Sequence, residues 1–256
     1  MKIATWNVNS LRTRLPHVQQ WLAEAKPDVL AVQEIKVTNE QFPTAAILEM
    51  GYEVVFNGQK THHGVATFAR DVMHDVCRDI PGFEDLQRRV LATTIQGVRV
   101  VNVYVPNGGS LDSDKYPYKL AWLAALRDWL AEEIKQYPQL VLLGDFNIAP
   151  ADEDIHDPAA WADQVLCSAP ERAAWQALCD LGLQDAYRLF DQPAGRFSWW
   201  DYRQAAYTRN LGLRIDTLLM TPKLAKCCTQ CVIDEGPRRL ERPSDHAPVW
   251  AALDLN

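Results

Sequence analysis

The chain has 256 residues, of which 48% are hydrophobic and 23% are charged, and this is the composition of a globular protein rather than a disordered one. It carries 26 Lys and Arg against 33 Asp and Glu, a formal net charge of −7, which argues against bulk attraction to nucleic acid, although local basic patches can override a net charge. No apolar run approaches the roughly 20 residues of a membrane helix, and six cysteines are too few for a disulfide scaffold.

One domain is expected to span residues 1–256, because no linker, low-complexity tract or repeat marks a boundary. The first residues lack the apolar core of a secretion signal, so we expect a cytoplasmic protein with reduced thiols. The group of Cys227, Cys228 and Cys231 has no nearby histidine and no second cysteine pair, so we interpret it as structural rather than as a zinc site.

The first predicted elements are a strand, a helix and a second strand. Residues 2–8 read as a strand, and apolar residues between 15 and 25 then recur at helical spacing. Pro27 ends this helix before a buried strand at 29–32.

The second half of the chain continues the alternation. Residues 98–106 are rich in β-branched side chains and predict a strand, a helix follows at 119–137, and the apolar strand 140–144 ends at Asp145. Ser168 and Glu171 form a predicted capping box for the next helix, and Gly182 is its expected C-cap. The last strands are predicted at 213–220 and 247–253. This interleaving indicates an α/β or layered α+β class.

Polar clusters lie beside these apolar strands. They contain Asn7 and Asn9, Glu34, Tyr104 and Asn107, Asp145 and Asn147, Arg214 and Asp216, and Asp245 with His246. Each cluster alone is weak, since an acid or amide after a strand usually forms a turn or a cap. Their co-occurrence predicts one shared pocket. Its many oxygens and single imidazole suit Mg²⁺ or Mn²⁺ better than zinc.

Six motifs, in order along nearly the whole chain, carry a family resemblance. They are Trp6-Asn7-Val8-Asn9-Ser10-Leu11-Arg12, Gln33-Glu34-Ile35-Lys36, Asn102-Val103-Tyr104-Val105-Pro106-Asn107, Gly144-Asp145-Phe146-Asn147-Ile148-Ala149-Pro150, Gly212-Leu213-Arg214-Ile215-Asp216 and Ser244-Asp245-His246-Ala247-Pro248. This series resembles the exonuclease III and AP endonuclease family of the endonuclease/exonuclease/phosphatase superfamily. The resemblance implies a four-layer α/β sandwich, with two mixed β-sheets packed face to face and flanked by helices, and a metal-dependent phosphodiesterase acting on DNA.

The resemblance also implies roles at the centre of the pocket. Glu34 would hold Mg²⁺, or Mn²⁺ as a substitute, with Asn7 and Asp245 nearby. Asp145 would deprotonate the attacking water, although a role in protonating the leaving group stays open. His246, paired with Asp216, would be a charged donor to a phosphate oxygen. This division suits a transition state that gathers negative charge.

Further residues are expected to face the substrate. By the same resemblance Asn147 would bind the scissile phosphate, and Tyr104 would act as a donor or as a phenolate. Asn107, Arg214 and Asn9 are predicted substrate contacts, and Trp199 is the aromatic residue of the stretch 197–202 that we expect to face DNA. Neighbouring His62 and His63 are either ordinary surface or core histidines or lie near the DNA edge.

The predicted substrate is double-stranded DNA with 3′ ends or abasic sites, bound by a monomer without membrane contact. We expect 3′→5′ exonuclease activity, 3′-end cleaning and AP endonuclease activity, the last depending on whether Leu166 blocks the pocket for an abasic sugar. One alternative is a catalytically inactive nucleic-acid-binding regulator of the same fold, in which the acidic set would have decayed. Another is a phosphodiesterase for RNA or a small phosphorylated substrate, for which membrane-binding loops or a secretion signal would be typical.

Overall fold

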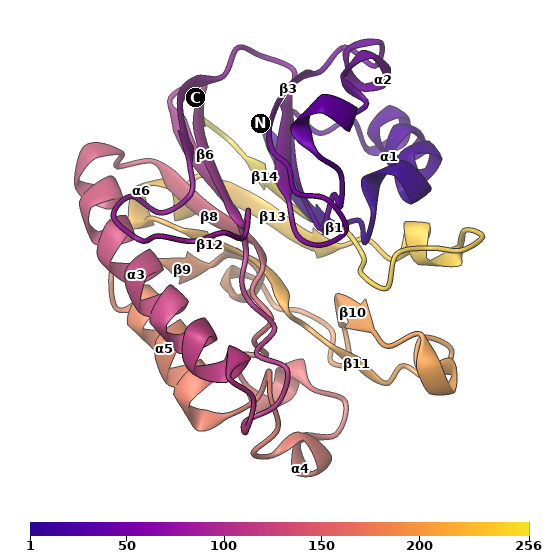
Figure 1. Ribbon diagram of the computed structural model, residues 1–256, viewed down its shortest axis with the longest axis vertical. Coiled ribbons are helices and arrows are strands. Elements are labelled where there is room, and N and C mark those ends of the chain that lie inside the picture. Colours follow the sequence, from indigo (N-terminus) through magenta and orange to yellow (C-terminus); the bar gives the residue numbers. More distant parts are fainter. Residues whose placement is uncertain (256) are drawn as a thin grey trace.

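A computed structural model describes residues 1–255, in which two six-stranded sheets pack face to face between layers of helices (Figure 1). The predicted four-layer α/β sandwich is therefore confirmed. None of the described helices is long and apolar enough to cross a membrane.

The first sheet combines the two ends of the chain. Its strands, in spatial order, are β13 (Cys228–Ile233), β14 (Val249–Leu253), β1 (Lys2–Asn7), β2 (Val29–Gln33), β4 (Val65–Ala69) and β3 (Glu53–Asn57). β1 and β2 run parallel, whereas β1 and β14 pair antiparallel across some 250 residues of sequence. Helices α1 (Leu11–Ala25) and α2 (Thr44–Leu48) cover the outer face, where residues such as Trp6, Leu22 and Phe68 are buried.

The second sheet is built from the middle of the chain. Its strands are β5 (His74–Arg78), β6 (Val90–Ile95), β7 (Val98–Tyr104), β8 (Leu140–Asp145), β12 (Asp216–Met220) and β9 (Gln184–Asp185). β7 and β8 are its parallel pair. Helices α3 (Lys115–Gln136) and α5 (Ala169–Cys179) lie on its outer face, and α3 buries Leu123, Leu126 and Leu130 against it. Short elements α4 (Pro158–Trp161), α6 (Pro222–Ala225) and the ribbon of β10 (Trp199–Trp200) with β11 (Gly212–Leu213) complete the fold.

Strand alternation makes both faces of each sheet apolar. Ile3 and Ala31 of the first sheet pack with Val100 and Leu143 of the second in the core between the sheets, while their chain neighbours point out toward the helices. Complete burial of one such side chain contributes about 1.5–3 kcal/mol. These apolar layers fix the parallel pair β1–β2 of the first sheet relative to the parallel pair β7–β8 of the second. The polar residues at the ends of these strands are positioned in this way.

Most predicted elements are confirmed within a few residues, but the predicted strand 213–220 is wrong. The chain forms two strands there, because Leu213 pairs with Trp199 in the small ribbon while the pairing with β8 begins only at Asp216. Between them the N–H groups of Arg214 and Ile215 donate to Asp154 and Ser198 instead of to a strand. The capping box is confirmed: the Ser168 hydroxyl accepts from the Glu171 N–H, and the Glu171 carboxylate accepts from the Ser168 N–H. Helix α5 itself ends at Cys179, before Gly182, whose φ of +94° lies in the left-handed region.

Candidate active site

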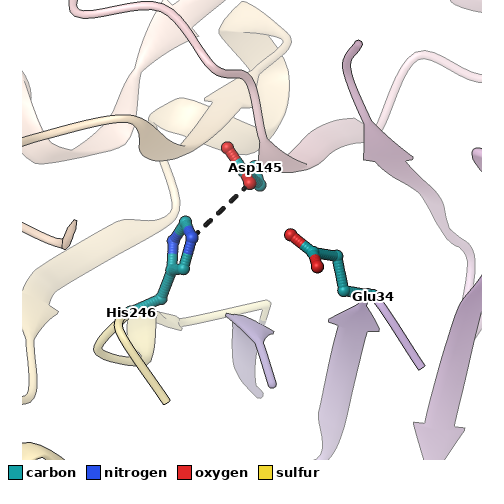
Figure 2. Close-up of side chains that lie close together, drawn as sticks. All are labelled: Glu34, Asp145 and His246. Atoms are coloured by element: carbon teal, nitrogen blue, oxygen red, sulfur yellow. Dashed lines mark ion pairs between the residues drawn. The ribbon is translucent and has the colours of Figure 1, made fainter. Parts of the chain in front are cut away.

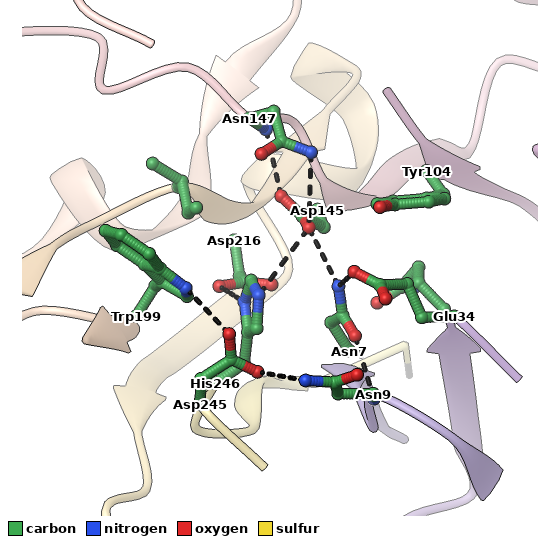
Figure 3. A network of polar contacts seen from close by, with 12 residues as sticks. Asn7, Asn9, Glu34, Tyr104, Asp145, Asn147, Trp199, Asp216, Asp245 and His246 are labelled. Carbon is green, nitrogen blue, oxygen red and sulfur yellow. Dashed lines mark hydrogen bonds and ion pairs between the residues drawn. The ribbon is translucent and has the colours of Figure 1, made fainter. Parts of the chain in front are cut away.

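The polar clusters meet at the edge of the sandwich where the two parallel strand pairs end (Figure 3). Asn7 ends β1 in the first sheet, and Asp145 ends β8 in the second. The Asn7 amide nitrogen donates to Glu34 Oε1 and to Asp145 Oδ2, both at 2.9 Å. One buried amide thus joins carboxylates supplied by the two sheets.

Glu34, Asp145 and His246 form the one group of metal-ligating side chains found among the described residues (Figure 2). One ligand atom from each lies within 4.8 Å of the others. Two carboxylates this close together fit a hard divalent cation, which prefers oxygen ligands. Since Asp145 belongs to this group, the acidic centre is wider than the predicted metal set.

The other two predicted metal contacts lie differently. Asn7 directs its amide nitrogen toward the carboxylates, and its oxygen accepts from the Asn9 N–H at 3.0 Å. A metal contact through Asn7 stays a prediction. Asp245 lies outside the group: one of its oxygens accepts from Asn9 Nδ2 and the other from Trp199 Nε1, each at 3.0 Å. A metal role for Asp245 stays a prediction.

Glu34 is held as a carboxylate. Burial alone would raise its pKa, but the Lys36 ammonium at 2.8 Å and the Asn7 amide outweigh burial and lower the pKa below the usual value. The residue has a φ of +51°, and the backbone N–H groups of the two residues after it both bond to the loop at 63–64, which helps to hold this turn. Glu34 therefore places a negative charge beside Asp145 and His246 at neutral pH.

Asp145 is almost completely buried among hydrogen-bond donors. Its Oδ1 accepts from the Asn147 N–H at 2.9 Å, and its Oδ2 lies 3.7 Å from His246 Nε2. Burial raises the pKa of Asp145 to about 7, against the opposing effect of the imidazole. A carboxylate with this pKa can take up a proton near neutral pH, as a general base must.

His246 is paired with a buried carboxylate. Its Nδ1 lies 2.8 Å from Asp216 Oδ2, and its backbone N–H donates to the Ser244 hydroxyl. Burial alone would lower the pKa of His246, but the Asp216 and Asp145 carboxylates outweigh burial and raise the pKa to about 10. His246 is therefore an imidazolium at neutral pH, suited to stabilise an anion.

Three uncharged side chains lie close to the two carboxylates, those of Tyr104, Asn147 and Asn107. Burial, followed by the Glu34 and Asp145 charges, raises the pKa of Tyr104 well above 10, which favours a phenol donor over the predicted phenolate. The Asn147 amide nitrogen donates to the Val105 carbonyl at 2.9 Å, and the Asn147 oxygen accepts from Asn107 Nδ2 at 3.1 Å. These contacts hold the two amides together at the ends of β7 and β8.

The structure gives no support to the predicted substrate contact of Arg214, which stays a prediction. This side chain is 1% exposed, and its guanidinium bonds to Asp154 at 2.6 and 3.1 Å and to Asp185 at 2.8 Å. It is therefore held in a buried ion-pair network beneath the loops. Asp185 and Asp154 lie 29 and 60 residues before Arg214 in the sequence. A match to a family motif does not reveal that such distant acids form ion pairs with its arginine.

The wall beside Trp199 is apolar. Leu166 is 4% exposed, with a φ of +78°, and packs in a cluster with Leu213 and Ile215 against which Trp199 lies. Leu166 therefore forms part of the packed wall next to the acidic centre.

Two contacts near the site went unpredicted. Lys36 pairs with Glu34, and its position two residues after Glu34 in a turn is the sequence signal that could have indicated this pair. Lys119 lies at the predicted start of a helix, yet it is completely buried, and no pattern in the sequence indicates its burial. Conversely, Cys231 is buried in β13, and no metal-ligating group among the described residues includes the nearby cysteines.

Known proteins of this type are similar along the whole chain. Residues 4–246 match the model of the Endonuclease/Exonuclease/phosphatase family. Exodeoxyribonuclease III of Haemophilus influenzae is 37% identical over 98% of this chain and 99% of its own. A solved 3′-5′ exonuclease from Neisseria meningitidis is 50% identical with a TM-score of 0.97, covering 99% of this chain and 100% of its own. An AP endonuclease from Archaeoglobus fulgidus is 40% identical with a TM-score of 0.96 over 100% of both chains.

Proposed function

Because the chain belongs to the Endonuclease/Exonuclease/phosphatase family, we propose that its site hydrolyses phosphodiester bonds of double-stranded DNA with the help of Mg²⁺. The chain is a DNA repair nuclease, a hydrolase of the exodeoxyribonuclease III and AP endonuclease type. Mn²⁺ would substitute for Mg²⁺ at an oxygen-rich site. We further propose that it acts as a monomer in the cytoplasm, where its six free thiols would stay reduced.

The observation that carries this proposal is the distance of 3.7 Å between a buried carboxyl group, Asp145, and a buried imidazole, His246, both with a raised pKa. A buried carboxylate with a raised pKa, Asp145, lies beside an imidazole that its neighbours keep protonated, His246. Such a separation of acid and base character within one pocket is typical of catalytic sites. In this assignment Asp145 takes the proton of the attacking water, and His246, oriented by Asp216, donates to a phosphate oxygen.

The cation and the uncharged donors would stabilise the developing negative charge. Glu34 would hold Mg²⁺, which when bound supplies positive charge to the phosphate, while Asp145 stays free to take the proton of the attacking water. Tyr104 and Asn147 would donate hydrogen bonds to phosphate oxygens, and Asn107 and Asn9 would contact flanking parts of the DNA. Electrostatic stabilisation of this kind is usually the largest single contribution to catalysis.

The substrate is proposed to be DNA with recessed 3′ ends, blocked 3′ ends or abasic sites. Relatives named as exonucleases and as AP endonucleases are both similar over the whole chain, which supports both activities. Trp199 and Leu166 line the apolar wall where an unpaired sugar would have to enter. Because Leu166 is packed into this wall, it would leave little room for an abasic sugar. This favours cleavage from a 3′ end over incision at an abasic site.

Two labelled duplexes test the proposal, one with a recessed 3′ end and one with a central abasic analogue, each with Mg²⁺ or with EDTA. We expect Mg²⁺-dependent shortening of the first duplex, weaker incision of the second, and no cleavage with EDTA. Asp145→Asn keeps the shape of the side chain and should lower kcat about 100- to 10,000-fold, the usual contribution of a general base. If the wild-type protein binds both duplexes and cleaves neither, it is a binding regulator and the proposal fails.

A further inference from the structure

A second lysine–glutamate pair lies behind the site and belongs to none of the predicted motifs for catalysis. Lys119 of α3 and Glu171 of α5 form an ion pair with an Nζ–Oε1 distance of 2.5 Å, and both side chains are 0% exposed. A buried pair of this kind is weak evidence for stability, because well-packed apolar side chains of similar volume often do as well. Its contacts therefore need an explanation other than stability.

Lys119 uses all three hydrogens of its ammonium group. Besides Glu171, Nζ donates to the backbone carbonyl of Asn147 at 2.6 Å and to that of Asn107 at 3.2 Å. These are the two residues whose side-chain amides meet at the ends of β7 and β8. Asn147 has a φ of +48°, in the left-handed region that asparagine tolerates better than most residues, and the bond from Lys119 to its carbonyl helps to hold it there.

Glu171 extends the same network to the apolar wall. Its Oε1 also accepts from the Leu166 N–H at 3.0 Å, and its Oε2 accepts from the Ser168 N–H at 3.1 Å and the Ser168 hydroxyl at 2.6 Å. All four contacts of this carboxylate are made within the protein. A capping-box residue thus connects the wall at Leu166, through Lys119, to the two amide-bearing loops.

We propose that Lys119 and Glu171 are positioning residues, which fix the backbone of Asn107 and Asn147 so that their amides are aimed at the DNA substrate. This rests on the proposed function, in which the Asn147 amide binds phosphate and the Asn107 amide contacts flanking DNA. Both charged side chains are 0% exposed, so the pair cannot touch the substrate and acts through the residues that it holds. Misplacement of such groups by about 1 Å is enough to lower a rate about 100-fold.

The test compares steady-state kinetics on the recessed 3′ duplex for wild type, the double variant Lys119→Met/Glu171→Gln, and Glu171→Gln alone. The double variant removes both charges and keeps a capping oxygen, so it avoids an unpaired buried charge. We expect its kcat to fall about 100-fold with KM nearly unchanged. Glu171→Gln keeps the ammonium and should lower kcat about 10-fold, the effect of weakening one charged hydrogen bond.

A matched control pair also uses a side chain of α3. Arg99 of β7 and Glu133 of α3 form an ion pair at 2.7 Å, with 3% and 13% of their side chains exposed, and Arg99 also donates to a carbonyl, that of Asp75. Arg99→Met/Glu133→Gln should therefore have the wild-type kcat. An equal loss of kcat in this control, or a wild-type kcat in either variant of the Lys119–Glu171 pair, would overturn the positioning role. Loss of cleavage by the wild-type protein itself would instead refute the proposed function.

Discussion

Two lysine–glutamate pairs border the catalytic centre, and they differ in their access to water. Lys36 and Glu34, from the turn after β2, are 26% and 18% exposed, whereas Lys119 and Glu171 are 0% exposed. The Lys36 ammonium shares its charge between Glu34 and the Asn9 oxygen at 2.5 Å, so another cation can compete for the same oxygens. The buried ammonium has no such competitor, because removing it would leave a carboxylate unpaired out of water. The exposed pair can therefore be broken by a competing cation, whereas the buried pair stays intact.

The largest expected difference between the pairs is in stability. Lys119→Met should lower the free energy of unfolding by about 3–5 kcal/mol, since it leaves the Glu171 carboxylate buried and unpaired. Lys36→Met should lower it by no more than about 1 kcal/mol, the usual effect of an exposed pair. Urea denaturation of both variants measures the contrast. Similar losses in the two variants would mean that exposure does not separate the pairs.

The next expected effect concerns the glutamate of the exposed pair. Glu34→Gln removes the charge that would hold Mg²⁺, so kcat should fall about 100- to 1,000-fold. The concentration of Mg²⁺ for half-maximal activity should rise at the same time. Glu49→Gln, at an exposed position after α2, is the control and should behave as wild type. A Glu34→Gln variant with an unchanged Mg²⁺ requirement would place the cation elsewhere.

A smaller effect is expected from the lysine of the exposed pair. Lys36→Met removes the ammonium that competes with the cation at Glu34, so the half-saturating concentration of Mg²⁺ should fall about five-fold, the equivalent of about 1 kcal/mol. A Mg²⁺ titration of the initial rate measures this shift. A rise in the requirement would show that Lys36 assists cation binding instead.

A last expected effect concerns the pH dependence of stability through His63, a neighbour of the exposed pair. His63 is half-buried against Tyr104, and burial, aided by the Arg89 charge, lowers its pKa to about 4. Between pH 6.5 and 4 the unfolded chain therefore binds more protons at this residue than the folded protein does, so stability falls as the pH falls. From pH 7 to 5 the wild type should lose more stability than His63→Gln, as measured by urea midpoints. Equal losses would show that His63 is solvated like an unfolded histidine.

Much of the fold could be predicted from the sequence, because buried strands and helices leave a regular pattern of apolar residues. The apolar run 140–144 predicted a buried strand, and β8 spans Leu140–Asp145. The strand expected at 213–220 failed since apolar content cannot show that Leu213 pairs with Trp199 and not with β8. Likewise the motifs brought Glu34, Asp145 and His246 together, but could not reveal that Arg214 is neutralised by Asp154. Pairwise contacts between distant segments decide such cases, and a single sequence does not contain them.

The pairing of β1 with β14 has a consequence for synthesis of the protein. Strand β1 leaves the ribosome early, but its neighbour β14 follows only after about 240 more residues, and His246 lies just before that last strand. Contacts of such long sequence separation form late, since a large loop must close first. Asn7 joins Glu34 of the first sheet to Asp145 of the second, so these contacts need both sheets to be packed together. A nascent chain that still lacks residues 246–253 therefore has neither His246 nor the strand that pairs with β1, and it is unable to assemble this site.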